Sequence, residues 1–218
     1  MALSGSVLFG FVVVHMLGNL KLFTGERHFN DYAVFLRTVG EPALPHGTLL
    51  WITRAVLLAC IGVHLVAAGQ VWVQSRRART SRYRKRDDLS FSYASRTMRW
   101  GGVIIVAFVV YHLLHLTLGV AHHDFIGADH ARAWAGHVNA YRNVVSGFRV
   151  PWISAAYVLA MIPLGLHIYH GLWSATQTLA LNGRRVKQWR RPFAAAVAGA
   201  IVLGNASIPL AVLLGWVG

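Results

Sequence analysis

The sequence predicts an all-α integral membrane protein, a bundle of five transmembrane helices. Of its 218 residues, 56% are hydrophobic and only 13% are charged, whereas a soluble domain averages about 25% charged residues. The charges fall mostly in short gaps between apolar runs that are too long for helices of a soluble core. We therefore treat residues 1–218 as a single membrane domain.

Five apolar runs are long enough to cross a hydrocarbon core of about 30 Å at about 1.5 Å per residue. A cleavable signal peptide is the competing interpretation of the first run. That run lacks a basic leading segment and a small-x-small cleavage site, and it contains His15 and Asn19. We therefore expect five spans, near residues 3–22, 49–73, 100–121, 152–180 and 193–217.

The loops predict the orientation, because Lys and Arg are retained on the cytoplasmic side of a membrane. Residues 74–99 and 181–192 together hold 14 of the 21 Lys and Arg residues. The other two gaps hold five of the seven acidic residues. We expect the amino terminus in the cytoplasm and the carboxyl terminus outside, in a bacterial cytoplasmic membrane.

Each outer loop contains a segment with helical spacing of apolar residues. We expect both segments to form short helices that lie in the membrane interface, although a loop that only touches the bundle would fit as well. The apolar positions are Phe29, Tyr32, Ala33 and Leu36 in one loop, and Val138, Tyr141, Val145 and Phe148 in the other.

The net charge of +14 does not indicate nucleic-acid binding, because the cations are confined to loops between spans. The single cysteine, Cys60, lies in an apolar run and excludes a disulfide framework or a thiolate metal cluster within the chain. Histidine is the unusual residue. There are 12, and six of them lie within the apolar runs.

A weak internal repeat selects four of these six histidines. Residues 11–17 match residues 108–114, and residues 62–65 match residues 165–168. The repeat places one histidine on each of the first four spans, at His15, His64, His112 and His167. His115 and His170 have no counterpart, and we expect them to form hydrogen bonds between helices or to a propionate.

Depth within the spans pairs the four histidines. Counted from the outer flanks, His15 and His112 lie 11 and 12 residues deep, whereas His64 and His167 lie 19 and 18 residues deep. The second pair should be deeper by about 10 Å at the helical rise. Buried imidazoles are normally bonded or functional, so two pairs at two depths predict two stacked metal groups.

The donor set favours haem b. Two imidazoles from facing helices, with no Asp or Glu in any span, suit bis-histidine ligation of haem iron better than a zinc or di-iron site. The haem propionates would need polar partners. The candidates are Arg99, Ser4 and Ser6 on the inner side and Arg54 on the outer side, all of which also fit as helix caps or snorkelling side chains.

The chain resembles the five-helix, two-haem cytochrome b membrane anchor of succinate dehydrogenase and fumarate reductase. The likeness covers all 218 residues in helix number, orientation and ligand order. The motifs that carry it are His15-Met-Leu-Gly-Asn-Leu20 with Phe29-Asn-Asp-Tyr32, the stretch from Arg99 to His112, and His167-Ile-Tyr-His-Gly-Leu-Trp-Ser174.

The resemblance implies that His15 and His112 hold the distal haem iron and that His64 and His167 hold the proximal one. It implies a flavoprotein subunit that oxidises succinate in the tricarboxylic acid cycle and an iron–sulfur subunit, both on the cytoplasmic face. This chain would then pass electrons through two haems to a quinone, in this family often menaquinone, without acting on succinate itself. Candidate quinone contacts on the outer side are His28, Asn30, Asp31, Glu41 and His46.

One position departs from the family. Some of its fumarate reductases carry a glutamate two residues before the fourth ligand, where this chain has Gly165. We therefore expect no transmembrane carboxylate relay. Two other functions remain open: a cytochrome b anchor of a hydrogenase or formate dehydrogenase, and a non-redox transporter with helices broken at positions such as Pro163.

Overall fold

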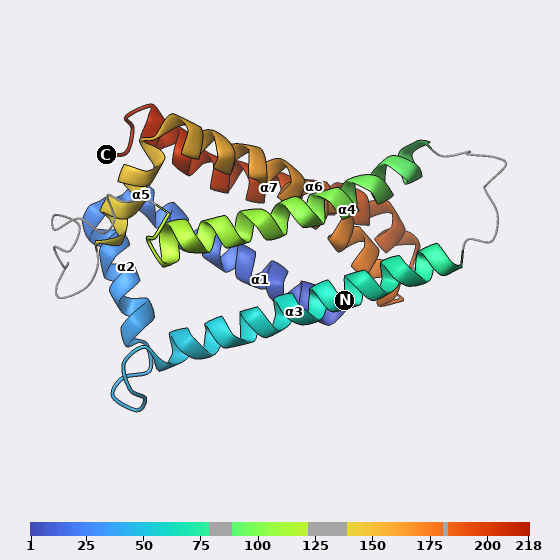
Figure 1. Ribbon diagram of the computed structural model, residues 1–218, viewed down its shortest axis with the longest axis horizontal. Helices are drawn as coiled ribbons and strands as arrows, with labels where there is room; N and C mark the ends of the chain where they lie inside the picture. Colours follow the sequence, from blue (N-terminus) through green and yellow to red (C-terminus); the bar gives the residue numbers. More distant parts are fainter. Residues whose placement is uncertain (79–88, 122–138, 181–182) are drawn as a thin grey trace.

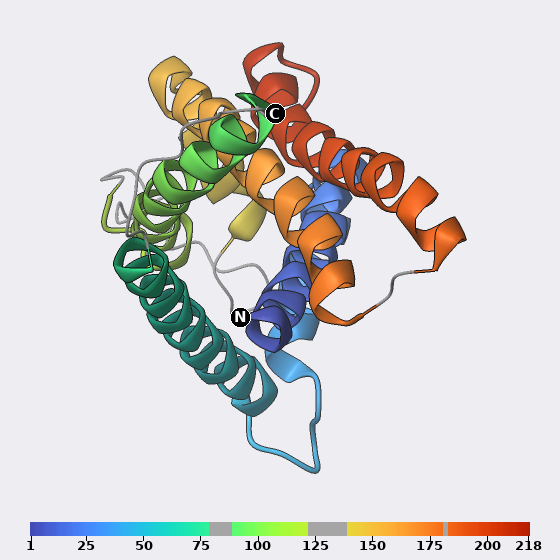
Figure 2. The ribbon, with the colours of Figure 1, turned by 90° about the vertical axis from the view of Figure 1, so that its right-hand side faces the viewer.

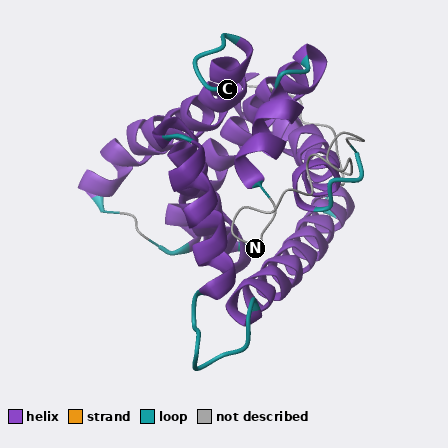
Figure 3. Ribbon diagram, turned by 90° about the vertical axis from the view of Figure 1, so that its left-hand side faces the viewer, coloured by secondary structure: helices purple, strands orange, loops and turns teal. Residues whose placement is uncertain are grey.

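The computed structural model describes residues 1–78, 89–121, 139–180 and 183–218, and in these ranges it contains helices and connecting loops without strands (Figure 3). The helices are α1 (Ala2–Asn19), α2 (Glu26–Thr38), α3 (Thr48–Arg77), α4 (Leu89–His112), α5 (Ala140–Phe148), α6 (Pro151–Thr178) and α7 (Arg184–Leu213). A 3₁₀ segment, Leu20–Thr24, follows α1, and a π-helical segment, Leu113–Thr117, follows α4.

Five helical stretches are long and apolar enough to span a membrane: Ala2–Thr24, Thr48–Arg77, Met98–Thr117, Pro151–Thr178 and Arg184–Leu213. They correspond one to one with the five expected runs. The third ends at Thr117 rather than at residue 121, after the π-helical segment. The fifth begins nine residues earlier than expected, so the basic residues 184–191 form the first turns of α7 rather than a loop.

Local sequence explains where several helices begin. Gly25 has a φ of 96°, a conformation that favours glycine, and it lets the chain turn from the 3₁₀ segment into α2. The Asn139 side chain caps α5 by accepting a hydrogen bond from the backbone N–H of Arg142. Pro151 occupies the first turn of α6, where its missing N–H has no cost.

The tightest packing joins α6 to α7, and α4 packs on α6 while α3 packs on α1. Small residues allow this approach, since a Cβ at Gly165 of α6 would collide with Val202 of α7. Viewed from one end, α3 and α7 lie at opposite edges of the bundle (Figure 2). Helix α3 contributes no buried residue, so most of its apolar surface is not covered by the described chain.

Helices α2 and α5 lie together at one end of the bundle, beside the carboxyl terminus (Figure 1). Buried Phe29 of α2 and Tyr141, Val145 and Phe148 of α5 form a core there with Leu22 and the end of α7. Both segments expected as short helices in the outer loops are therefore helical. Val138, the first apolar position expected in the second segment, lies outside the described residues.

Candidate functional site: two facing histidine pairs

His15 of α1 and His112 of α4 face each other across the bundle. Their ring centroids are 5.8 Å apart and the ring planes are perpendicular. Phe11 stacks on His15 at 5.2 Å and Phe108 lies 5.8 Å from His112, each one helical turn before the histidine. The aromatic neighbours make the surroundings of this pair apolar.

His64 of α3 and His167 of α6 form the second pair, with ring centroids 6.1 Å apart and an interplanar angle of 65°. The Ser4 hydroxyl lies 3.4 Å from His64 Nδ1. Gly5 also lies against this ring, since a Cβ at residue 5 would be 3.4 Å from His64 Cε1, an ordinary van der Waals contact. The start of α1 thus packs directly against the His64 imidazole.

The two pairs lie at different levels of the bundle. Ser4, beside His64, precedes His15 by 11 residues on α1, which corresponds to about 16 Å at the helical rise. Tyr157, whose ring lies 5.9 Å from that of His112, precedes His167 by 10 residues on α6, or about 15 Å. Both helices give a separation larger than the expected 10 Å, because the sequence count assumed that the flanks of the four spans lie at one level.

His15 and His112 lie in the last turns of α1 and α4, whereas His64 and His167 lie near the middle of α3 and α6. The last turns of α1 and α4 are at the end of the bundle that carries α2 and α5 (Figure 1). The order of the pairs along the bundle axis is therefore the one expected. Helices α1, α3, α4 and α6 each contribute one imidazole.

The donor geometry fits a metal bound by two imidazoles. Two imidazoles that share one ion place their ring centres roughly 6 Å apart, since each metal–nitrogen bond is about 2 Å. The Nδ1 atoms of His112 and His167 are buried and have no hydrogen-bond partner among the described residues. Each of these rings therefore has bonding capacity that the described chain does not use, a costly state in an apolar setting.

Two ligands per site also restrict the kind of metal group. Within the described ranges, no three His, Cys, Asp or Glu side chains converge on a point where they could hold an ion. A structural zinc or di-iron site needs more protein ligands than two. Haem iron needs only two axial ligands, because the macrocycle supplies the other four. The residues present fit haem better than a bare ion.

The candidate propionate partners differ in their surroundings. Arg99 is exposed on α4, 13 residues before His112. On α1, Ser6 is exposed and Ser4 is buried. Arg54 of α3 stacks on Trp51 at 4.7 Å. Burial and the Arg54 charge both lower the pKa of Arg37 in α2, so two cations lie close together at the corner between α2 and α3. An anion would be favoured there.

The two histidines outside the repeat make hydrogen bonds within the chain. His115 is fully buried, and its Nδ1 lies 2.8 Å from the Tyr157 hydroxyl of α6. His170 Nδ1 lies 3.0 Å from the Leu166 carbonyl, in its own helix. His115 thus forms the expected contact between helices, whereas the bond of His170 is local.

A buried polar network joins α2 to α5, which sequence reasoning did not identify. Asn30 Nδ2 donates to Asn139 Oδ1 at 3.0 Å, and the Tyr141 backbone N–H donates to Asn30 Oδ1 at 3.0 Å. Asn139 Nδ2 in turn donates to Glu26 at 2.7 Å. Asn30 had been a candidate quinone contact, but the structure gives it a role in packing. No local signal in the sequence indicated this network, because the bond between Asn30 and Asn139 joins residues 109 positions apart.

The other candidate quinone contacts lie on the surface at this end of the bundle. His28 and Asp31 are exposed on α2, and Arg27 lies 3.9 Å from the Asp31 carboxylate. The Glu41 carboxylate accepts a hydrogen bond from His46 Nδ1 at 2.9 Å in the following loop. None of these contacts brings the four side chains to a common point.

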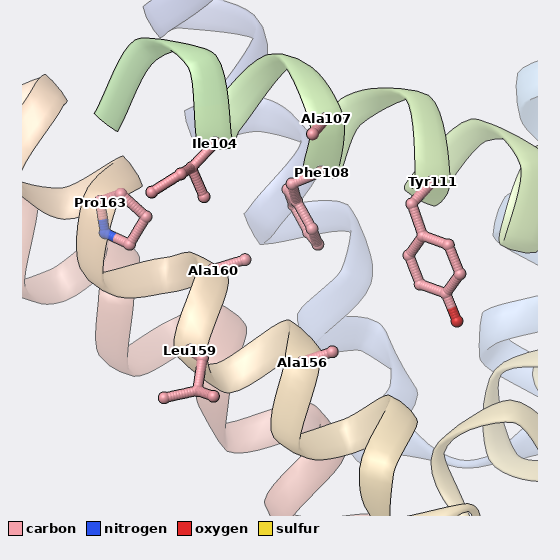
Figure 4. A pocket seen from close by; sticks show the side chains of 8 residues that line it. All are labelled: Ile104, Ala107, Phe108, Tyr111, Ala156, Leu159, Ala160 and Pro163. Atoms are coloured by element: carbon pink, nitrogen blue, oxygen red, sulfur yellow. The ribbon is translucent and has the colours of Figure 1, made fainter. Parts of the chain in front are cut away.

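A separate apolar groove of about 450 Å³ lies between α4 and α6 (Figure 4). It is lined by Ile104, Ala107, Phe108, Tyr111, Ala156, Leu159, Ala160 and Pro163. Tyr111 alone among these carries a polar side-chain group, and none of the four paired histidines lines the groove. Its lining suits an apolar chain and contains no His, Cys, Asp or Glu.

Comparisons with known proteins give no assignment: no protein-family model, curated protein or solved structure matches the chain. A function for the chain is therefore inferred from the geometry of the histidine pairs and from the resemblance in sequence pattern.

Proposed function

We propose that this chain is a di-haem cytochrome b, the membrane anchor of a succinate:quinone oxidoreductase. The observation that supports this most directly is the pair of facing imidazoles at each of two levels, one from each of four different helices. A multi-pass membrane location agrees with the five apolar helices.

His15 and His112 would hold one haem iron, and His64 and His167 would hold the other. Bound haem supplies one-electron redox chemistry. The helices keep each imidazole in place, and Phe11 and Phe108 exclude water around the first pair. Ser4 would orient His64 through its Nδ1, since a bond to the second ring nitrogen fixes the ring and its tautomer.

The partners follow from the same proposal. A flavoprotein and an iron–sulfur subunit would bind at the expected cytoplasmic end, where the basic last turn of α3 and the basic first turns of α7 lie. Electrons would pass from the inner pair, His64 and His167, to the outer pair, His15 and His112, and then to menaquinone. The chain would thus complete the quinone-reacting part of the enzyme, and succinate would be oxidised elsewhere.

Short helices α2 and α5 would lie at the outer interface in this orientation. Their buried faces pack on the bundle, whereas Arg27 and Asp31 stay exposed. Such a two-sided helix is typical of the interface. The quinone would bind near this end, close to the His15–His112 level.

The test is a reduced-minus-oxidised visible spectrum of the purified chain, with haem extracted and counted. We expect b-type bands and two haems per chain. One haem would contradict the two-site arrangement. Absence of haem after expression with haem precursor would overturn the proposal and leave a non-redox transporter, although α6 continues unbroken through Pro163.

A further inference from the structure

Two arginines converge on one indole ring where α6 ends and α7 begins. The guanidinium carbon of Arg190 lies 5.7 Å from the centroid of the Trp173 ring, and that of Arg191 lies 5.4 Å from it. Each contact is of the cation–π kind, which stabilises a cation without neutralising it. Two like charges are thus concentrated at a single aromatic side chain.

Arg190 also has hydrogen-bonding capacity that the described chain does not use. Its Nε is buried and has no partner among the described residues. Neither α6 nor α7 contains an Asp or Glu. A buried guanidinium N–H without an acceptor is costly, and an anionic oxygen is the acceptor that guanidinium groups bind best.

The surroundings indicate where that anion comes from. Trp189 is 69% exposed and Phe193 is 62% exposed, and they are four residues apart on one face of α7, next to Arg190. These side chains flank the cations at the end of two membrane-spanning helices. Aromatic and basic side chains at this level meet lipid headgroups and the first carbons of the acyl chains.

We propose that Trp173, Arg190 and Arg191 form a binding site for the phosphate of an anionic phospholipid, with Trp189 and Phe193 contacting its glycerol and acyl portions. The phosphate oxygens would accept hydrogen bonds from both guanidinium groups, including Arg190 Nε. The site requires neither haem nor partner subunits. A negative result for lipid binding would therefore not affect the proposed electron-transfer function, and the reverse also holds.

The experiment compares the full-length protein in nanodiscs of phosphatidylcholine with and without phosphatidylglycerol. Lipid that remains bound after transfer to mild detergent is counted by mass spectrometry of the intact protein, and its affinity is measured by titration. We expect retained phosphatidylglycerol, and roughly tenfold or greater weakening in the double variant Arg190→Gln/Arg191→Gln, because it removes both guanidinium groups that would form charge-assisted hydrogen bonds to the phosphate.

The double variant Arg184→Gln/Arg185→Gln is the matched control, since it removes the same charge from exposed positions of the same helix. It should bind phosphatidylglycerol as the wild type does. If both double variants weaken binding equally, general charge attraction explains the lipid and the site is excluded. If the glutamine variant does not fold, Arg190→Lys/Arg191→Lys keeps the charge and should still weaken binding, because lysine lacks the planar paired donors.

Asp87 and Asp88 lie outside the described residues, in the segment of the sequence between α3 and α4. If they neutralised the arginines, wild type would show no preference for phosphatidylglycerol, and Asp87→Asn/Asp88→Asn would acquire one. That result, or retention of an acidic protein in place of lipid, would overturn the proposal. Inorganic phosphate at millimolar concentration should not displace the lipid.

Discussion

His115 and Tyr157 form a buried hydrogen bond of 2.8 Å that joins the π-helical segment after α4 to the first half of α6. Tyr111 stacks on the His115 ring at 5.6 Å, and Phe148 of α5 lies 4.8 Å from the Tyr157 ring. This aromatic cluster lies directly beside His112, whose ring is 5.9 Å from that of Tyr157. The cluster therefore supports one member of the His15–His112 pair.

Removal of the Tyr157 hydroxyl should destabilise the protein. Tyr157→Phe keeps the ring and removes the bond to His115, which should lower the free energy of unfolding by about 1–3 kcal/mol. Thermal unfolding in detergent measures the change. Tyr169→Phe is the matched control, since that hydroxyl has no hydrogen bond within the described ranges and its removal should have little effect. Equal effects of the two substitutions would contradict the assigned role of Tyr157.

The sequence was sufficient to predict the five long helices, because each apolar run exceeds the length needed to cross a bilayer. It also predicted which histidines face each other, because the internal repeat selects one histidine per helix and their depth within the spans pairs them. Helix α7 begins nine residues before the expected fifth span. The basic residues before this span indicated a loop between spans. Lysine and arginine are good helix formers, however, and here they lie next to an apolar run, at Arg184, Lys187 and Arg191.

Features that depend on contacts between distant segments were not predictable. The separation of the two histidine levels depends on how α1 meets α3, which the Ser4–His64 contact shows and loop counting does not. The π-helical segment at Leu113–Thr117 has no distinct local signature. The bond between Asn30 and Asn139 joins residues 109 positions apart, so neither local periodicity nor composition could indicate it.

Asn30→Ala should loosen the attachment of α2 to α5. Asn30 is 1% exposed, and its loss leaves the Tyr141 N–H and the Asn139 side chain without a buried partner. We expect a loss of about 1–3 kcal/mol in unfolding free energy for each orphaned group, seen as a lower melting temperature. Arg27→Ala on the exposed face of the same helix removes only a weak ion pair and should change stability by less than about 1 kcal/mol. A stable Asn30→Ala protein would show that the network is dispensable.

Glycine at position 165 is needed for the close approach of α6 and α7. A Cβ there meets the β-branched side chain of Val202, which has little freedom to rotate away in a helix. Gly165→Ala should therefore destabilise the protein by about 1–3 kcal/mol through overpacking. Gly171→Ala on the same helix adds a Cβ where no atom lies within 4 Å, so stability should be unchanged or slightly higher. The reverse order in a chemical-unfolding series would refute this packing argument.

The absence of Asp and Glu from the five expected spans predicts dependence on membrane potential, provided that the proposed function is correct. Electrons would move outward to menaquinone, toward the positive side of an energised membrane, without a compensating carboxylate relay. The membrane potential would therefore favour the reaction by about 2.3 kcal/mol per charge per 100 mV. An uncoupler should then suppress succinate-driven menaquinone reduction in intact cells that express the complex. Unchanged reduction after the potential collapses would exclude this coupling.

If the proposed di-haem function is correct, single substitutions in the two pairs should remove different haems. His112→Ala takes one ligand from the His15–His112 level, and His167→Ala takes one from the His64–His167 level, about 15 Å away along α6. Since each haem depends on its own two axial ligands, each variant should retain about one haem per chain and lose a different component of the redox titration. His170→Ala is the control, because its Nδ1 bonds to the Leu166 carbonyl of its own helix, and it should retain both haems. Retention of two haems by His112→Ala or His167→Ala would show that the altered imidazole is not a ligand, and loss of both by either variant would mean that the two levels do not bind independently.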